Sequence, residues 1–349
     1  MRVLVTGANG LLGGNLCRAL LNDGHDVRAM VREGSDLSTL EGLDVERVFG
    51  DVRDSDALKN AAHGCELFFH TAAVFSYWGY DKEGMYETAK RGAENAVEAA
   101  KAAGIKRMVL TSTTAVLGSS PTPTPKDENA VPNLDATPDY FRSKALQEQT
   151  AFAHGQKIGL DVVAANPSIF IGPYDFKPSA SLPTVTGYIT APMLLTFDGG
   201  ANLAHVEDIA RGHILVGEKG TSFERHILAG DNITWPDAHA LISELCGLPK
   251  PRTKTSRRAA YLASAAMEVQ AKITGKPPQG TRELSKQIGQ YFWYDAAKAK
   301  ALGFTARSTR EVLVDTLGWL LTSTHLSDKQ KGKLKPVDDV LQARTRYER

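Results

Sequence analysis

Tyr140 and Lys144 stand four residues apart in the stretch TPDYFRSKALQEQ, and this pair of residue types could transfer a proton. Pro138 suits the first turn of a helix that Thr137 or Asp139 could cap. On such a helix Tyr140 and Lys144 share one face, so the ammonium could lower the pKa of the phenol. A surface pair with a buried ring has the same spacing, so the neighbouring motifs must decide between the two interpretations.

A second candidate site is the glycine-rich segment VLVTGANGLLGGNL near the start of the chain. Gly7 can form a tight turn, Gly10 lets the backbone approach a pyrophosphate, and Gly13 allows a helix to pack closely on a strand. The N–H groups that begin this helix would face the phosphates. A simple turn is the alternative, but the position at the first strand–helix junction favours a dinucleotide site. Its expected residues are Gly7, Asn9, Gly10, Leu11, Leu12 and Gly13.

The residue that ends the second expected strand, Arg32, bears on which dinucleotide binds. NAD sites commonly carry Asp or Glu there to bind the ribose 2′-hydroxyl, whereas a guanidinium suits a 2′-phosphate. Asp36 lies further along the loop, and we expect it to be too far away. We therefore expect NADP as the cofactor, with NAD as the alternative.

Two further strand ends carry residues that could contact the same cofactor. Asp51 and Val52 follow the third strand in GDVRD, where an adenine could bind. The motif HTAA follows the fourth strand, and its small residues would let the middle of the dinucleotide come close; they are Thr71, Ala72 and Ala73. Ordinary packing at strand ends would explain the same residues.

Short β-rich runs alternate with helical patterns along the first half of the chain. Near-continuous apolar strands separated by helices indicate a parallel sheet that is covered on both faces. The sequence therefore predicts an α/β fold with a doubly wound Rossmann sheet. The expected strands are 2–6, 26–31, 45–49, 66–71, 107–112 and 160–166, with a last strand at 224–229.

The pattern changes near residue 170, where the chain becomes rich in Pro, Gly, Ser and Thr and then mostly helical. We expect a cofactor-binding Rossmann domain formed by 1–172 and about 203–232, and a smaller, mostly helical substrate-binding lid formed by about 173–202 and 233–325. The polar residues 326–349 are expected to form a solvated tail. The apolar stripe of RRAAYLASAAMEVQAKITG predicts a packed lid helix or, alternatively, a helix on a membrane surface.

Composition argues against several function classes. The formal net charge of the 349 residues is +1, so no global field favours nucleic acid. The three cysteines and nine histidines show neither a disulfide framework nor metal-ligand spacing, so we expect no metal. We find no apolar run that could span a bilayer and no secretory signal, so we expect a cytoplasmic protein with a small-molecule substrate.

Several motifs occur together in a fixed order: TGxxGxxG at the start, then GDVRD, HTAA, TSTTAVLG and YFRSK. Together they resemble the extended short-chain dehydrogenase/reductases over about residues 1–325. Within that group the chain is most similar to dihydroflavonol reductases, 3β-hydroxysteroid dehydrogenases and hopanoid-associated sugar epimerases. The joint pattern is specific for the superfamily and says little about the substrate.

The resemblance implies a catalytic set of Thr113, Tyr140 and Lys144. Tyr140 would exchange the proton while Thr113 binds the substrate oxygen and Lys144 holds the nicotinamide ribose. Tyr140 and Lys144 would thus also contact the cofactor. Three further cofactor contacts are implied, namely Thr111 and, beside the nicotinamide, Pro167 and Ser168.

Two positions depart from the pattern of the resembling families. Relatives commonly carry Asn on the helix after the fourth strand, where this chain has Ala89, so another group must order the site. Enzymes that act on sugar nucleotides usually carry Asn three residues before the Gly of the Gly-Pro pair, where this chain has Ile169. Ile169 is expected to contact the substrate and argues against a nucleotide sugar.

Aromatic residues are dense in AVFSYWGYDKEGMY, which follows the fourth strand. The mouth of a doubly wound sheet lies there, so Phe75 and Trp78, with Tyr77 and Tyr80, could form a wall for a bulky apolar substrate. The alternative is that they cover the core. The lid could add Tyr174, Phe176, Tyr188 and Met193, and the expected substrate-binding set is Phe75, Trp78, Thr113 and Ile169.

The sequence therefore favours an NADP-dependent oxidoreductase that interconverts a ketone or aldehyde and an alcohol on a bulky hydrophobic or aromatic substrate. One alternative is an NAD-dependent epimerase or dehydratase acting on a sugar or sugar nucleotide, and another is a non-catalytic NADP-sensing protein. The resemblance also implies a possible homodimer formed through the two long helices, at about 84–103 and 138–156.

Overall fold

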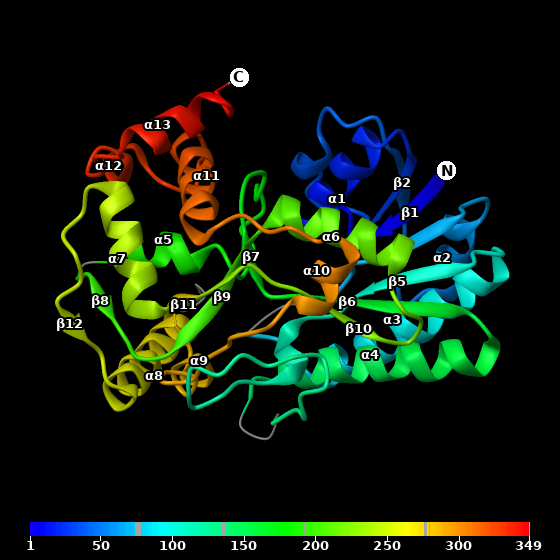
Figure 1. Ribbon diagram of the computed structural model, residues 1–349, viewed down its shortest axis with the longest axis horizontal. Helices are drawn as coiled ribbons and strands as arrows, with labels where there is room; N and C mark the ends of the chain where they lie inside the picture. The colour runs from blue at the N-terminus through cyan, green and yellow to red at the C-terminus, as the bar shows by residue number, and fades with distance from the viewer. Residues whose placement is uncertain (74–77, 134–136, 192, 276–277, 279, 349) are drawn as a thin grey trace.

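A seven-stranded parallel sheet forms the larger part of the molecule (Figure 1). In the computed structural model, which describes residues 1–73, 78–133, 137–191, 193–275, 278 and 280–348, its strand order is β10-β6-β5-β4-β1-β2-β3. The order reverses between β1 and β4, as in a doubly wound Rossmann fold, and this confirms the predicted fold class. The strands are β1 (Arg2–Thr6), β2 (Asp26–Val31), β3 (Glu46–Phe49), β4 (Leu67–His70), β5 (Arg107–Thr111), β6 (Asp161–Pro167) and β10 (Arg225–Leu228).

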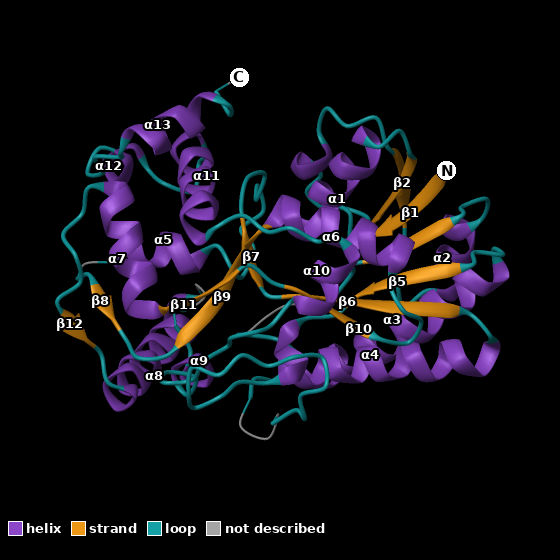
Figure 2. Ribbon diagram, viewed as in Figure 1, coloured by secondary structure: helices purple, strands orange, loops and turns teal. Residues whose placement is uncertain are grey.

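Helices cover both faces of this sheet (Figure 2). Side chains alternate along a strand, so Val3 and Val5 join the apolar core on one face while Leu4 joins the core on the other. The first face is covered by α1 (Leu11–Asn22) and α6 (Val206–Lys219), beside which lies α10 (Ala297–Leu302). The second face is covered by α2 (Ser55–Ala62), α3 (Lys82–Ala102) and α4 (Asp139–Ile158). Two 3-10 helices, η1 (Ser38–Leu40) and η2 (Thr114–Leu117), follow β2 and β5.

A second sheet leads from the Rossmann part into the lid, and the sequence did not predict it. Its strand order is β11-β9-β7, formed by β7 (Ile169–Ile171), β9 (Gly200–His205) and β11 (Asp231–Thr234). A two-stranded sheet of β8 (Leu195–Thr196) and β12 (Thr253–Lys254) lies further out. The stretch expected as irregular loop thus also contains regular structure, including α5 (Pro183–Ile189).

The lid has an apolar core of its own, which includes Val185, Ile242, Leu317 and Trp319. Its helices are α7 (Trp235–Cys246), α8 (Arg257–Thr274), α9 (Arg282–Ser285) and α11 (Thr309–Thr322), and the predicted helical character is confirmed. None of the helices in the described part of the chain has the length and apolar character needed to cross a membrane.

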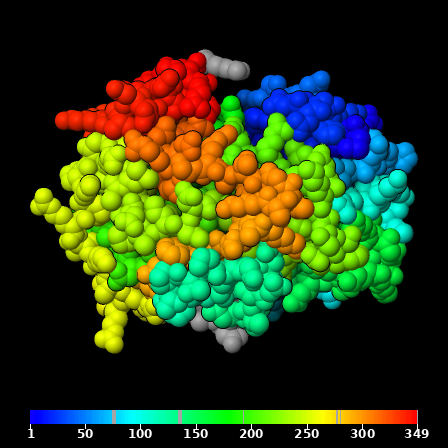
Figure 3. All heavy atoms as spheres, viewed as in Figure 1, coloured from blue at the N-terminus to red at the C-terminus, as the bar shows by residue number. Residues whose placement is uncertain are grey.

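The C-terminal segment is folded, so the predicted solvated tail is wrong. It forms α12 (Asp328–Lys331) and α13 (Asp338–Thr345), and the red segment packs on the orange one in Figure 3. Val340 and Ala343 are buried, and the Tyr347 hydroxyl donates to Asp315 Oδ2 of α11 at 2.8 Å. The two buried apolar residues of α13 thus dock this short helix, although the segment as a whole is polar. The other domain boundaries stay predictions.

Candidate active site

Thr113 and Tyr140 meet at the carboxyl edge of the main sheet. Thr113 is the N-cap residue of η2, two residues after the end of β5, and its Oγ1 accepts a hydrogen bond from the Ala115 N–H at 3.2 Å. The hydroxyl of Tyr140, in the first turn of α4, is hydrogen-bonded to Thr113. Parallel strands present their carboxyl ends at one edge, so the fold brings these two hydroxyl groups together.

Lys144 lies one turn further along α4 and is almost completely buried, with 3% of its surface exposed. Its Nζ donates to the Thr111 carbonyl at 2.6 Å and to Gln147 Oε1 at 2.5 Å. A buried ammonium requires such partners because its hydration has been lost. Ala89, at the position where relatives commonly have Asn, is itself buried and has no polar side chain, whereas Gln147 supplies an amide oxygen.

Gln147 links Lys144 to the first strand through His70. Its Nε2 lies 3.4 Å from His70 Nε2, and His70 Nδ1 lies 2.9 Å from Thr6 Oγ1. Burial lowers the pKa of His70 to about 3, so the ring is neutral and can accept at one nitrogen and donate at the other. The sequence interpretation missed Gln147 and His70. The sequence features that could have indicated them are a Gln one helical turn after Lys144 and a His at the end of an apolar strand.

Burial shifts the pKa values of Tyr140 and Lys144 in opposite directions. It raises the pKa of Tyr140 above its ordinary value of 10, although the hydrogen bond to Thr113 acts to lower it. It lowers the pKa of Lys144 from 10.5 to about 7, against the attraction of the Glu148 carboxylate. The prediction of a lowered pKa for Tyr140 is therefore wrong for this arrangement, and the phenol is protonated at neutral pH.

The start of α4 also differs from the prediction. Pro138 is the N-cap residue and Asp139 is the first helical residue, so the Asp139 carboxylate does not cap the helix. It accepts hydrogen bonds from the hydroxyls of Tyr80 at 3.1 Å and Tyr86 at 3.2 Å, and it pairs with Lys82 Nζ at 2.9 Å. These contacts fasten the start of α3 and the residues just before it to the first turn of α4.

The backbone of the glycine loop fits a dinucleotide. Gly7 has a φ of +67°, and a Cβ there would lie 2.9 Å from the Ala72 backbone. A Cβ on Gly13 would lie 2.3 Å from the Gly7 carbonyl oxygen, so both positions require glycine. Gly10 is the N-cap of α1 and has no capping side chain, which leaves the first N–H groups of the helix for a phosphate. Leu11 and Leu12 form the first turn of this helix and are buried.

Arg32 lines a surface pocket beside the glycine loop, together with Asp36 and Lys177. Asn9 Nδ2 donates to the Asp36 carbonyl at 3.1 Å, so the loop after β2 is fastened to the glycine loop. Asp36 therefore lies closer than predicted, although its carboxylate accepts hydrogen bonds from the N–H and the hydroxyl of Ser38, at 2.9 and 2.7 Å. The pocket is lined by two cationic side chains that could bind a phosphate, Arg32 and Lys177, and by two acidic ones, Glu33 and Asp36.

The other residues predicted from strand ends lie along the same edge. Asp51 is paired with Arg53 at 2.9 Å, and Val52 packs against the apolar core beneath α3. The Thr71 hydroxyl donates to the Thr6 carbonyl at 2.7 Å, which holds the HTAA segment against β1. Ala72 lies against Gly7, and Ala73 is exposed.

The hydroxyl of Ser168, which follows β6, is buried and unpartnered within the described ranges. Ser168 comes directly after Pro167, whose carbonyl lies 3.5 Å from Thr113 Oγ1. A polar ligand group would satisfy the Ser168 hydroxyl. The Thr111 hydroxyl, predicted to face the cofactor, lies instead 3.0 Å from His213 Nε2, and only the Thr111 carbonyl reaches the site. The residues present thus fit a nicotinamide dinucleotide.

The predicted substrate wall is only partly described. Phe75 and Tyr77 lie outside the described residues, while Trp78 and Tyr80 are half-buried and Ile169 begins β7. The lid residues proposed to join them have other contacts. Tyr188 stacks on His239 with its hydroxyl 2.7 Å from Ser243 Oγ, Tyr174 lies under Arg18, Phe176 packs on Trp319, and Met193 is exposed.

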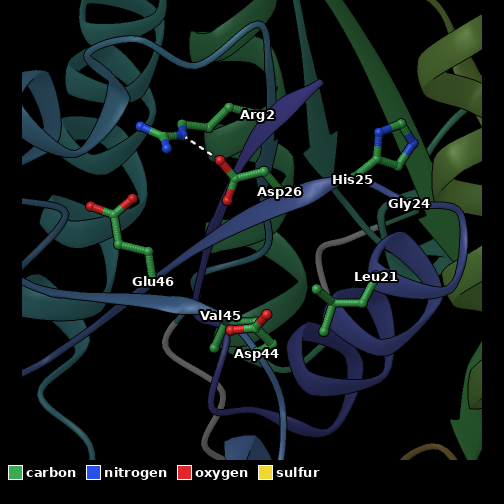
Figure 4. A pocket seen from close by; sticks show the side chains of 8 residues that line it. All are labelled: Arg2, Leu21, Gly24, His25, Asp26, Asp44, Val45 and Glu46. Atoms are coloured by element: carbon green, nitrogen blue, oxygen red, sulfur yellow. Dashed lines mark hydrogen bonds and ion pairs between the residues drawn. The ribbon is translucent and has the colours of Figure 1, made fainter.

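A different pocket opens at the opposite edge of the sheet (Figure 4). Arg2 and Asp26, which begin β1 and β2, form an ion pair of 2.7 Å beside it. Ligands of open parallel sheets bind at the carboxyl ends of the strands, so this pocket is not the candidate site. No group of three His, Cys, Asp or Glu among the described residues could hold a metal ion.

This fold and this arrangement of residues define an NAD(P)-dependent oxidoreductase of the extended short-chain dehydrogenase/reductase type. Residues 3–230 match the model of the NAD dependent epimerase/dehydratase family, and the chain belongs to that family.

Three comparisons support this assignment. A putative dihydroflavonol 4-reductase of Synechocystis is 34% identical over 90% of this chain and 93% of its own length. Sterol demethylase protein B of Methylococcus capsulatus is 30% identical over 91% of this chain and 98% of its own length. The crystal structure of gox2253 superposes with a TM-score of 0.79 and 31% identity, covering 93% of this chain and 99% of the other.

The lowered pKa of Lys144 predicts a pH-dependent difference in stability between the protein and its Lys144→Met variant. Between about pH 7 and 10.5 the unfolded chain binds this proton more strongly than the folded chain, so the free energy of unfolding rises with pH. The methionine of the variant does not titrate and contributes no such term. We expect the wild-type free energy of unfolding to gain about 2 kcal/mol on the variant between pH 7 and 9. Urea unfolding of both proteins measures this, and a constant difference would contradict it.

Proposed function

We propose that this protein is an NADP-dependent carbonyl reductase, which interconverts a ketone or aldehyde and an alcohol on a bulky hydrophobic or aromatic substrate. The observation that carries the proposal is the Tyr140 hydroxyl, hydrogen-bonded to Thr113 one turn before a buried Lys144. A neutral phenol suits a proton donor, which is the role that reduction of a carbonyl requires. The similarity to a putative dihydroflavonol 4-reductase supports the same direction.

In this mechanism the two hydroxyl groups act on the substrate oxygen. When bound, the nicotinamide supplies the hydride that adds to the carbonyl carbon. Thr113 Oγ1 accepts from the Ala115 N–H and donates to the Pro167 carbonyl over 3.5 Å, and in the proposal this long bond gives way so that Thr113 donates to the oxygen that gains negative charge. Tyr140 then gives its proton to that oxygen. In the oxidative direction both transfers reverse.

Lys144 is the proton source for Tyr140 in the proposal. A group with a pKa of about 7 gains and loses a proton readily near neutral pH, so Lys144 can restore the Tyr140 proton through an intervening water or ribose hydroxyl. Gln147 and the Thr111 carbonyl hold its Nζ beneath the site. His70 orients Gln147, because the glutamine amide must direct its oxygen to the ammonium and its nitrogen to the ring.

The substrate class follows from the apolar residues around the mouth. Trp78, Tyr80 and Ile169 surround the approach to Tyr140 in the proposal, with Phe75 as a further predicted contact. Ile169 offers no hydrogen bond to a diphosphate-sugar, which favours a reductase over the epimerases and dehydratases that share the family. A homodimer through 84–103 and 138–156 and a cytoplasmic location stay predictions.

Tyr140→Phe tests the proposed chemistry. A panel of bulky ketones and aldehydes is screened with NADPH, and the kcat of the variant is measured on the best substrate. We expect kcat to fall by about 10²- to 10⁴-fold, because the proton donor is gone while the ring remains. The NADPH affinity, measured by fluorescence titration, should change little. Unchanged turnover in the variant would contradict the proposal.

The pocket that contains Arg32 and Lys177 supports NADP as the cofactor. The Arg32 guanidinium and the Lys177 ammonium can both pair with a 2′-phosphate, and Asn9 keeps the loop that carries Arg32 close to the glycine loop. Asp36 could accept a ribose 2′-hydroxyl, which is the observation in favour of NAD.

Arg32→Ser tests this preference. We expect the KM for NADPH to rise on the order of tenfold to a hundredfold, because a charge-assisted contact is lost, while the KM for NADH stays unchanged. Arg310→Ser is the matched control, since Arg310 is paired with Glu244 and Asp339 outside this pocket. An equal rise in the KM for NADPH and for NADH would show that Arg32 does not bind the 2′-phosphate.

A further inference from the structure

Helix α8 turns an apolar stripe to the solvent. Leu262, Val269 and Ile273 are 70%, 59% and 80% exposed, and with Ala266 they recur at intervals of four, three and four residues. This spacing places the four side chains on one face of the helix. The sequence pattern favoured a stripe packed against the lid, and that interpretation is wrong.

The opposite face of α8 is the one that packs. Ser264 Oγ lies 2.7 Å from Ser285 Oγ of α9, and Glu268 accepts from Arg282 Nε at 2.6 Å and from the Arg282 N–H at 2.7 Å. Ala271 completes the buried face. The helix is therefore anchored by polar contacts and displays its larger aliphatic residues, which reverses the usual amphipathic arrangement.

The exposed stripe lies in a strongly basic segment. Residues 250–276 contain seven Lys or Arg and a single acidic residue, although the whole chain has a formal net charge of only +1. The acidic residue, Glu268, is buried in its pair with Arg282. The described basic residues are all exposed, and they are Lys250, Arg252, Lys254, Arg257, Arg258 and Lys272.

We infer that α8 is a docking surface for an anionic lipid bilayer. Aliphatic side chains along one face can enter the boundary between headgroups and acyl chains while Arg and Lys beside them reach the phosphates. A second copy of the chain would place this basic segment against its own equivalent, which like-charge repulsion disfavours. The helix lies on the membrane and does not cross it.

The position of α8 gives this docking a consequence. The yellow segment that includes α8 forms the outer edge of the lid in Figures 1 and 3, away from the main sheet. The packed face of α8 contacts α9 through Ser264 and Ser285. Glu283 of α9 in turn lies near Asp139, the first residue of α4, whose carboxylate adds to the effect of burial in raising the pKa of Glu283. A bilayer bound to α8 would thus lie one helix layer from the segment that leads to Tyr140. Apolar substrates dissolved in the membrane would be within reach.

Vesicle sedimentation with the full-length protein tests the inference, and it needs neither cofactor nor substrate, so it is independent of the proposed function. The probes are vesicles of phosphatidylcholine alone and of phosphatidylcholine with about 30% phosphatidylglycerol, which imitates a charged leaflet. We expect the wild type to sediment with the anionic vesicles on the order of tenfold more than with the neutral ones, and to dissociate as salt is raised.

Two variants separate the apolar and ionic contributions. Leu262→Glu with Ile273→Glu should lower the binding to anionic vesicles by about tenfold or more, and Arg258→Ser with Lys272→Ser should lower it by a similar factor and flatten the salt dependence. Leu341→Glu, at a half-exposed apolar position on α13, is the matched control and should bind like wild type. Circular dichroism checks that each variant is folded.

Three results would overturn the inference. They are a wild type that ignores anionic vesicles, a Leu262→Glu/Ile273→Glu variant that binds as well as wild type, and a wild-type dimer that this double variant dissociates. The last outcome would assign the stripe to a second copy of the chain.

Discussion

The burial of one ammonium group sets the geometry of the candidate active site. Lys144 has lost its water and is held by the Thr111 carbonyl and Gln147, so its position depends on β5 and α4 lying at a fixed distance. Tyr140 lies one helical turn earlier, and it therefore meets Thr113 at the end of the same strand. The same burial lowers the pKa of Lys144 to about 7 and keeps the phenol protonated.

The buried polar chain from Lys144 through Gln147 and His70 connects the proposed catalytic residues to the glycine loop. His70 contacts Thr6, the last residue of β1, and Gly7 follows at once with its positive φ. A displacement of the glycine loop would therefore disturb the orientation of Gln147 as well. Position 89 on α3 is Ala, whereas the amide that contacts Lys144 comes from Gln147 on α4. We propose that Gln147 takes the place of the Asn that relatives commonly carry at position 89.

The main sheet could be predicted from the sequence because its strands are continuous apolar runs separated by helices, and such runs can be recognised from a short window of sequence. The second sheet could not, since β7 has three residues and pairs with β9 some thirty residues later in the chain. The glycine loop and the Tyr140–Lys144 pair could be predicted because their residues have a characteristic spacing in the sequence. Gln147 could not, because its role depends on its contacts with Lys144 and with His70, which is distant in the sequence.

Other errors have equally local causes. Residues 326–349 were predicted to be a solvated tail because most of them are polar. The buried side chains that dock α13, Val340 and Ala343, are too few to change the average polarity of the segment. Asp139 looked like a helix cap because capping residues and first-turn residues have the same types, and only the contacts with Tyr80 and Lys82 separate the two roles. The sequence correctly predicted an apolar stripe on α8 but wrongly predicted that it packs against the lid. Periodicity shows which residues share a helix face and does not show what that face contacts.

The proposed reaction is net reduction of a substrate by the cofactor, with Tyr140 as the proton donor. The most direct measurement follows turnover with NADPH that is deuterated at nicotinamide C4, using each of the two stereoisomers, and analyses the product by mass spectrometry. The account predicts that one stereoisomer transfers its deuterium to the new carbinol carbon, with one NADP⁺ formed for each alcohol. Product that forms without deuterium and without net oxidation of NADPH would contradict it and would indicate an epimerase or dehydratase.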